Sequence, residues 1–133
     1  MTHAEGDLRR SINILQSASS LFQGKPISVN EITEIAGAVP ATVAENANDV
    51  YLKGSSREII SFVDDVVAEG YAINQVIQQI GSTVVRSPHM SDLQKAKASR
   101  ALSIADHRLT DGAEESIQLM YVTSEIRKIC QGA

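Results

Sequence analysis

Residues 73–85 read INQVIQQIGSTVV, and this stretch decides whether the chain contains a β-sheet. Its β-branched pair, Val84 and Val85, favours a strand by propensity. Its large aliphatic side chains, however, recur at intervals of three and four residues, which is the spacing of one face of an α-helix. We expect this period to outweigh the propensity, so that Gly81 lies inside a helix. The residues that set the period are Ile73, Val76, Ile77, Ile80 and Val84.

Helical patterns also occupy the sequence on both sides of this stretch. Three helix starts carry capping boxes, in which a serine caps the helix and a Glu or Gln three residues later bonds back to it. These pairs are Ser28 with Glu31, Ser55 with Glu58, and Ser91 with Gln94. No segment alternates with a period of two, so the sequence predicts an all-α fold of about seven helices. They are expected near residues 7–22, 28–36, 41–53, 55–69, 73–85, 91–109 and 113–129.

A domain boundary is expected at Pro40, because a proline pushes the residue before it out of the helical region. This boundary divides the chain into residues 1–39 and 40–133. About five helices follow Pro40 with short turns between them, so they can close a compact bundle. The part before Pro40 has about two helices, and the first is apolar along a whole face. Two helices cannot bury such a face by themselves, so we expect it to need a further covering surface.

The composition is that of a packed soluble domain, with 43% hydrophobic and 21% charged residues. A net charge of −4 provides no basic field that would collect nucleic acid or anionic lipid, so any nucleic-acid role would be indirect. No apolar run approaches a membrane span, and the acidic N-terminus does not fit a signal peptide. The single cysteine, Cys130, cannot form an internal disulfide, so we expect an intracellular protein without membrane contact. Its basic neighbour Lys128 could lower its pKa, but packing is the role we expect for Cys130.

Common catalytic signatures are absent from the sequence: it has no phosphate-binding loop, no zinc-protease helix motif and no nucleophile elbow. The histidines stand far apart with no acid at metal-ligand spacing, so we expect exposed polar groups and no metal site. Acidic residues occur in adjacent pairs, which point in different directions on a helix and do not share a site. We therefore expect no catalytic residues. The histidines are His3, His89 and His107, and the acidic pairs are Asp64–Asp65 and Glu114–Glu115.

Residues 27–51 resemble the helix-turn-helix of bacterial repressors in the spacing of their apolar residues. A recognition helix needs donors for base edges and phosphates. The candidate recognition helix, residues 41–53, instead carries Glu45 and Asp49 against one lysine, so phosphate would repel it. The sequence therefore disfavours a direct DNA reader.

A specific resemblance to a known family covers nearly the whole chain. Residues 5–13 read EGDLRRSIN and continue as LQSA at 15–18, which is similar to the sensor-2 helix in the lid of AAA+ clamp-loader small subunits, the replication factor C family. Residues 35–40, IAGAVP, are similar to the family's exit from the lid into its collar domain. The resemblance to that collar rests on residues 69–71, Gln79, residues 106–109, Gly112, Glu115, Gln118 and Leu119.

This resemblance implies a C-terminal fragment of a small subunit, made of the end of the lid and the collar domain. The implied fold is all-α: a five-helix collar-type bundle over residues 40–133, preceded by two helices of an incomplete AAA+ lid over residues 1–39. The ATPase core of the family is not present in these residues, so the chain is not expected to hydrolyse ATP on its own. No cofactor is expected in the fragment, whereas the intact subunit would bind ATP and Mg²⁺.

The same resemblance implies a site residue. In that family the arginine after Gly-Asp-Leu reaches the terminal phosphate of bound ATP, so this role goes to Arg9, with Arg10 as the weaker candidate. An arginine suits it because its planar fork binds phosphate oxygens with two donors and stays charged. One contact cannot replace a pocket, so weak nucleotide binding at best is expected without the core.

The implied partners are other replication factor C subunits, because the family's collars assemble five subunits into a ring. The sliding clamp and primed DNA would be reached only through the intact complex, which loads the clamp, and the implied location is the nucleus. The residues leave one alternative open, namely a helical adaptor that holds a protein partner on one face of its bundle and has no tie to replication.

Overall fold

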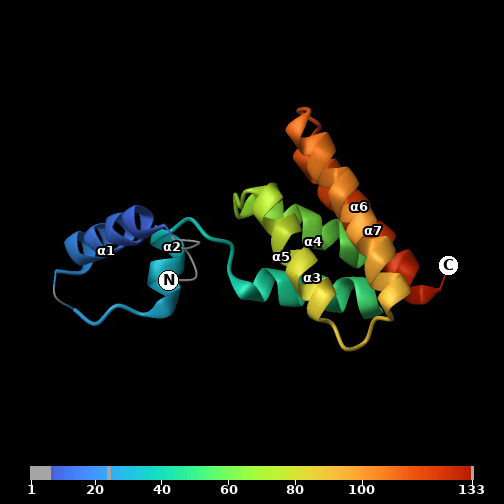
Figure 1. Cartoon of the computed structure of the whole chain (residues 1–133), viewed down its shortest axis with the longest axis horizontal. Coiled ribbons are helices and arrows are strands. Elements are labelled where there is room, and N and C mark those ends of the chain that lie inside the picture. The colour runs from blue at the N-terminus through green and yellow to red at the C-terminus, as the bar shows by residue number, and fades with distance from the viewer. Residues whose placement is uncertain (1–6, 24, 133) are drawn as a thin grey trace. The chain divides into compact units, whose positions relative to one another are not determined.

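A computed structural model describes residues 7–23 and 25–132, and within them it forms seven helices and no strand (Figure 1). This confirms the all-α prediction, including the helix expected over residues 73–85. The helices are α1 (Leu8–Phe22), α2 (Val29–Ile35), α3 (Ala41–Lys53), α4 (Ser56–Ala68), α5 (Ile73–Arg86), α6 (Asp92–Thr110) and α7 (Glu115–Gln131).

Contacts between helices divide the chain into two compact units. Unit 1 is Met1–Pro40 and contains α1 and α2, whereas unit 2 is Ala41–Ala133 and contains α3 to α7. Each unit has its own internal contacts, so each is described by itself.

Unit 1 has well-formed helix ends but almost no core. The Ser28 capping box is present, with Glu31 accepting from the Ser28 backbone N–H at 2.6 Å and Ser28 Oγ accepting from the Glu31 N–H at 3.3 Å. Gly37 follows α2 with a φ of 62°, a left-handed conformation that suits a residue without a Cβ.

In α1 only Ala18 is buried, and Leu15 is 67% exposed. The apolar face of α1 is thus uncovered within unit 1, as expected for two helices.

Unit 2 is organised around α7, which packs against each of the other four helices of the unit. The short turn after α6 makes α6 and α7 an antiparallel pair, seen as the long hairpin in Figure 1. At the open end of this hairpin, Gln94 Nε2 donates to the carbonyl oxygen of Ile129 at 3.0 Å. The core is aliphatic apart from two aromatic side chains. Its members include Tyr51, Phe62, Val63, Ile73, Val76, Ile80, Val84, Leu119, Val122 and Ile126.

Both predicted capping boxes of unit 2 are present, at Ser55 with Glu58 and at Ser91 with Gln94. The Glu58 carboxylate accepts from the backbone and side chain of Ser55, and these hydrogen bonds hold its pKa below the usual range. Glu114 caps α7 by accepting from the backbone N–H groups of Ser116 and Ile117. These two carboxylates therefore stabilise the starts of α4 and α7.

Some large apolar side chains of unit 2 are exposed although they follow the period of a buried helix face. Val67 lies four residues after the buried Val63 on α4 but is 48% exposed, and Ile117 near the start of α7 is 61% exposed. The buried face of α4 includes Phe62, which lies at the opposite edge of that face from Val67. A helical period predicts a stripe, but its exact arc depends on which neighbours pack against the helix.

Replacing Tyr51 by Phe tests the cost of one buried hydroxyl. Tyr51 is fully buried, and its Oη meets no hydrogen-bond partner among the described residues. Burial raises its pKa to about 12, with Cys130 adding to the effect. Because a phenol in an unfolded chain ionises near pH 10, the stability that this group confers is complete below about pH 10 and falls as pH rises through about 12.

We therefore expect Tyr51→Phe to be as stable as the wild type at pH 7 or more stable by about 1 kcal/mol. It should also lose less stability than the wild type between about pH 10 and 12. Melting temperatures measured by circular dichroism across this range would show the difference. Tyr121→Phe, at a partly exposed tyrosine, is the matched control. Parallel alkaline curves for wild type and Tyr51→Phe would contradict the expectation.

Candidate functional site

Arg9 and Arg10 lie in the first turn of α1, and both side chains are exposed. Asp7 caps this helix: its Oδ1 accepts from the Arg9 N–H at 2.8 Å and from the Arg10 N–H at 3.4 Å. The Asp7 carboxylate also offsets the unfavourable effect of two cations at the positive end of a helix dipole. Both guanidinium groups therefore project from an ordered helix start. The nucleotide role of Arg9, and the weaker one of Arg10, stays a prediction.

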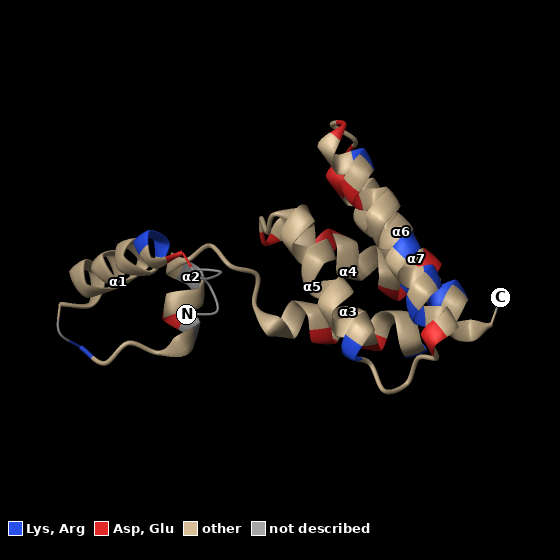
Figure 2. Cartoon of the chain, viewed as in Figure 1, with Lys and Arg blue, Asp and Glu red and all other residues tan. Residues whose placement is uncertain are grey.

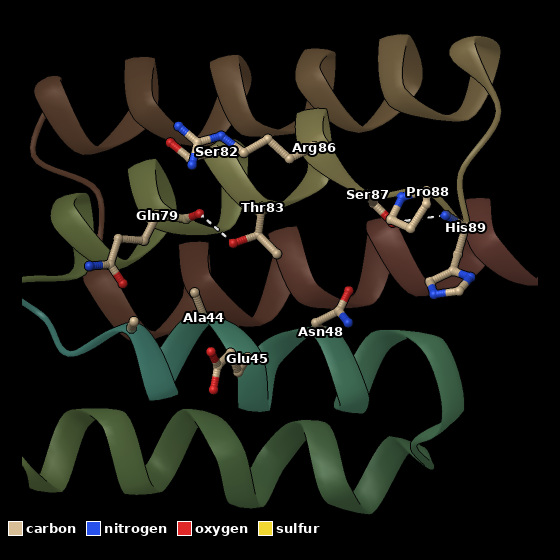
Figure 3. Close-up of a pocket in the computed structure, with 11 residues that line it drawn as sticks. Ala44, Glu45, Asn48, Gln79, Ser82, Thr83, Arg86, Ser87, Pro88 and His89 are labelled. Carbon is tan, nitrogen blue, oxygen red and sulfur yellow. Dashed lines mark hydrogen bonds between the residues drawn. The ribbon is translucent and has the colours of Figure 1, made fainter.

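A groove of about 440 Å³ lies between α3 and α5 in unit 2 and extends to the start of the turn before α6 (Figure 3). Two hydroxyl groups that line it form hydrogen bonds with the backbone of nearby residues. Thr83 Oγ1 donates to the Gln79 carbonyl oxygen at 3.0 Å, and Ser87 Oγ accepts from the His89 N–H at 3.3 Å. Neither hydroxyl is paired with a general base in these contacts.

The histidines that the structure describes are exposed polar groups, as expected. His89 lies at the rim of that groove, and His107 Nδ1 is 3.7 Å from Asp111 Oδ2 on the surface. His3 lies outside the described residues. Over residues 7–23 and 25–132, no group of three or more His, Cys, Asp or Glu side chains is arranged to hold a metal ion. None of the described helices is both long enough and apolar enough to cross a membrane.

Cys130 is half-buried near the end of α7, and burial raises the pKa of its thiol. The nearby ammonium group of Lys128 is 2.7 Å from Glu125 Oε1. The thiol is therefore less ionised than an ordinary cysteine, which supports the packing role expected for it and not a nucleophilic one.

The helix proposed as a DNA-recognition element is α3, and its apolar face is part of the core of unit 2. Val43, Ala47 and Tyr51 are buried there against neighbouring helices. The face left exposed carries Glu45 and Asp49, which repel phosphate. This arrangement supports the conclusion that α3 is not a DNA reader.

Comparison with models of protein families shows which family the chain belongs to. The family model for the replication factor C C-terminal domain matches residues 39–125, which is more than half of the chain. This chain belongs to that family. The match begins next to the boundary between the two units and covers α3 to α6 and most of α7.

Three individual relatives illustrate the relationship, and each is a replication factor C subunit. The chain is 36% identical to replication factor C subunit 2 of Schizosaccharomyces pombe over 125 residues, which is 94% of this chain and 37% of that protein. It is 37% identical to replication factor C subunit 4 of Homo sapiens over 123 residues, 92% of this chain and 34% of that protein. It is 31% identical to replication factor C small subunit 1 of Pyrobaculum aerophilum, over 95% of this chain and 38% of the relative. The chain thus spans little more than a third of the length of these relatives.

Three contacts of this replication factor C domain were not predicted from its sequence. Arg108 lies over the ring of Tyr121, with its guanidinium carbon 4.9 Å from the ring centre. Arg127 Nη1 donates to Ser56 Oγ at 3.0 Å, and Gln94 bonds to the backbone of Ile129. Each joins residues that are distant in sequence, and no local spacing rule signals such a pair.

Alkylation of Cys130 tests whether its thiol is protected. We expect native protein to react with iodoacetamide at pH 8 more slowly than the same chain unfolded in urea, because the raised pKa reduces the thiolate fraction. Since the chain has one cysteine, mass spectrometry reports this site alone, and Cys130→Ser gives the blank. Equal rates in the folded and unfolded chains would contradict the protected state.

Proposed function

We propose that this chain is the C-terminal part of a replication factor C small subunit, and that residues 40–133 act as its collar domain. In this role the five-helix unit joins the chain to other replication factor C subunits in the ring-shaped ATPase that loads the sliding clamp on primed DNA. Residues 40–133 contribute assembly to that complex, and residues 1–39 contribute Arg9. The clamp and the DNA are contacted only by the complete complex, which works in the nucleus.

The observation that carries this proposal is the family match to residues 39–125, because it coincides with a unit that has its own core. The other four helices of that unit are packed around α7. A domain of this kind is suited to binding other proteins through its surface. The reported relatives are all replication factor C subunits, which favours this role over the unrelated helical adaptor.

Residues 1–39 are proposed as the end of an AAA+ lid, with α1 as its sensor-2 helix. The exposed apolar residues of α1, such as Leu8 and Leu15, support this because they need a further protein surface to cover them. In the intact subunit, which binds ATP and Mg²⁺, the Arg9 guanidinium would reach the terminal phosphate. Arg10 is the weaker candidate for that contact.

Assembly with other subunits tests the collar proposal. We expect the chain, co-expressed with the other replication factor C subunits of the same organism, to form a complex of defined mass measured by light scattering. The apolar faces that a collar shares with its neighbours account for this association. If those subunits assemble with an intact small subunit but never retain this chain, the collar proposal is wrong.

Substitution of Arg9 tests the lid proposal in a subunit that has its ATPase core. We expect Arg9→Ala to leave assembly unchanged and to lower ATP-dependent clamp loading by roughly tenfold to a hundredfold, the range for a lost hydrogen bond to a charged group. Arg10→Ala is the matched control, and its effect should be smaller. Clamp loading at the wild-type rate in Arg9→Ala would contradict the sensor role.

A further inference from the structure

Ser56 and Arg127 are hydrogen-bonded to each other in a surface groove of unit 2. The groove has a volume of about 420 Å³ and is lined by residues of α4 and α7. Arg127 Nη1, near the end of α7, donates to Ser56 Oγ, at the start of α4, at a distance of 3.0 Å. Ser56 is exposed, so solvent reaches this residue from the groove. The groove therefore leaves room beside the Ser56 hydroxyl for a larger polar group.

Arg127 is a partly buried cation that lacks an anionic partner. It forms no ion pair with any residue that the structure describes. Its Nε is buried and meets no hydrogen-bond acceptor there, and the bond to Ser56 uses one of the five N–H donors of the guanidinium. A buried donor without an acceptor costs free energy. An oxyanion beside Ser56 would supply acceptors, and a guanidinium can bind an oxyanion through two parallel hydrogen bonds.

The charges around this pair favour an anion. Arg57 is the next residue on α4, and Lys128 of α7 lines the same groove. Figure 2 shows Lys and Arg gathered at this end of α7 and over the adjoining start of α6. The carboxylates nearby are engaged: Glu58 caps α4, and Glu125 is 2.7 Å from the Lys128 ammonium group. Together with Arg127, three cations thus stand against two carboxylates, which leaves an excess of positive charge.

The backbone at the start of α4 also favours a negative charge on Ser56. Ser56 is the first residue of this helix and follows the N-cap residue Ser55, whose Oγ accepts from the Glu58 N–H at 3.3 Å. The first N–H groups of a helix have no acceptor within it, and the helix dipole places partial positive charge at this end. The first residue of a helix also frays at little cost, which makes its side chain accessible to an enzyme.

We propose that Ser56 is a phosphorylation site and that Arg127 binds the phosphate. A protein kinase uses ATP as the donor: a bond forms between Ser56 Oγ and the γ-phosphorus, the bond from that phosphorus to ADP breaks, and the hydroxyl proton is released. The added phosphate oxygens lie next to the Oγ that the guanidinium already contacts. Charge-assisted hydrogen bonds then join the end of α7 to the start of α4, and the excess charge of the group changes from positive to negative.

Phosphoserine incorporated at position 56 during translation tests the contact with Arg127. We expect the phosphorylated chain to melt about 4 °C or more above the unmodified chain, because new charge-assisted hydrogen bonds stabilise unit 2. In Arg127→Gln, whose side chain is neutral, the same phosphate should raise the melting temperature by much less. Circular dichroism follows each melt, and it verifies that unmodified Arg127→Gln is folded before the two forms are compared.

Ser116 provides the matched control for the effect of the helix dipole. It lies in the first turn of α7, but its hydroxyl donates to Glu114 Oε2 at 2.8 Å. A phosphate at this position would meet a like charge, so phosphoserine at 116 should lower the melting temperature. If it raises the melting temperature as much as phosphoserine at 56 does, the helix dipole accounts for the effect and the role of Arg127 is overturned.

Mass spectrometry of the intact subunit, isolated from dividing and from resting cells of its own organism, tests whether the site is used. Digestion after Glu gives a peptide of residues 46–58, in which fragmentation distinguishes Ser56 from Ser55. We expect phosphate on Ser56. Its absence in both preparations, or a phosphate on Ser55 alone, would overturn the assignment. Neither test measures binding to other subunits, so failure of this inference would leave the collar proposal standing.

Discussion

The burial of α7 among the other four helices of unit 2 is the constraint on which the bundle depends. Leu119, Val122 and Ile126 are fully buried on this helix, and truncating one such side chain to Ala typically costs about 2 to 5 kcal/mol. Thr123 is equally buried, but its hydroxyl donates to the Leu119 carbonyl oxygen at 2.8 Å, so this hydroxyl is satisfied. Because α3, α4, α5 and α6 all contact α7, their mutual positions follow from how it is packed.

This arrangement places the chemistry of unit 2 on its surface. The carboxylates with lowered pKa values, Glu58 and Glu114, owe the shift to hydrogen bonds with the helix ends that they cap. The buried titratable groups, Tyr51 and the half-buried Cys130, have raised pKa values because burial disfavours their charged forms. Neither kind of shift produces an acid or base poised for catalysis near neutral pH.

Local rules predicted most of the secondary structure but few of the contacts between helices. Capping boxes and the three-to-four residue period act within one helix, so the helix starts at Ser28, Ser55 and Ser91 could be inferred from neighbouring residues. The exposure of Ile117 could not, because it depends on which helices pack beside α7. The bond between Arg127 and Ser56 joins residues 71 positions apart, and only the folded chain brings them together.

The two units of this chain differ in what keeps their helices formed. Helix α1 buries only Ala18 among its 15 residues, so packing within unit 1 contributes little to its stability. An isolated helix of this length is marginal in water, and α1 therefore depends on a covering surface to stay formed. Helices α4 and α7 each bury one face in the core of unit 2, so packing within that unit keeps them formed. Loss of its covering surface would therefore unfold α1, whereas α4 and α7 would stay folded on the core of their own unit.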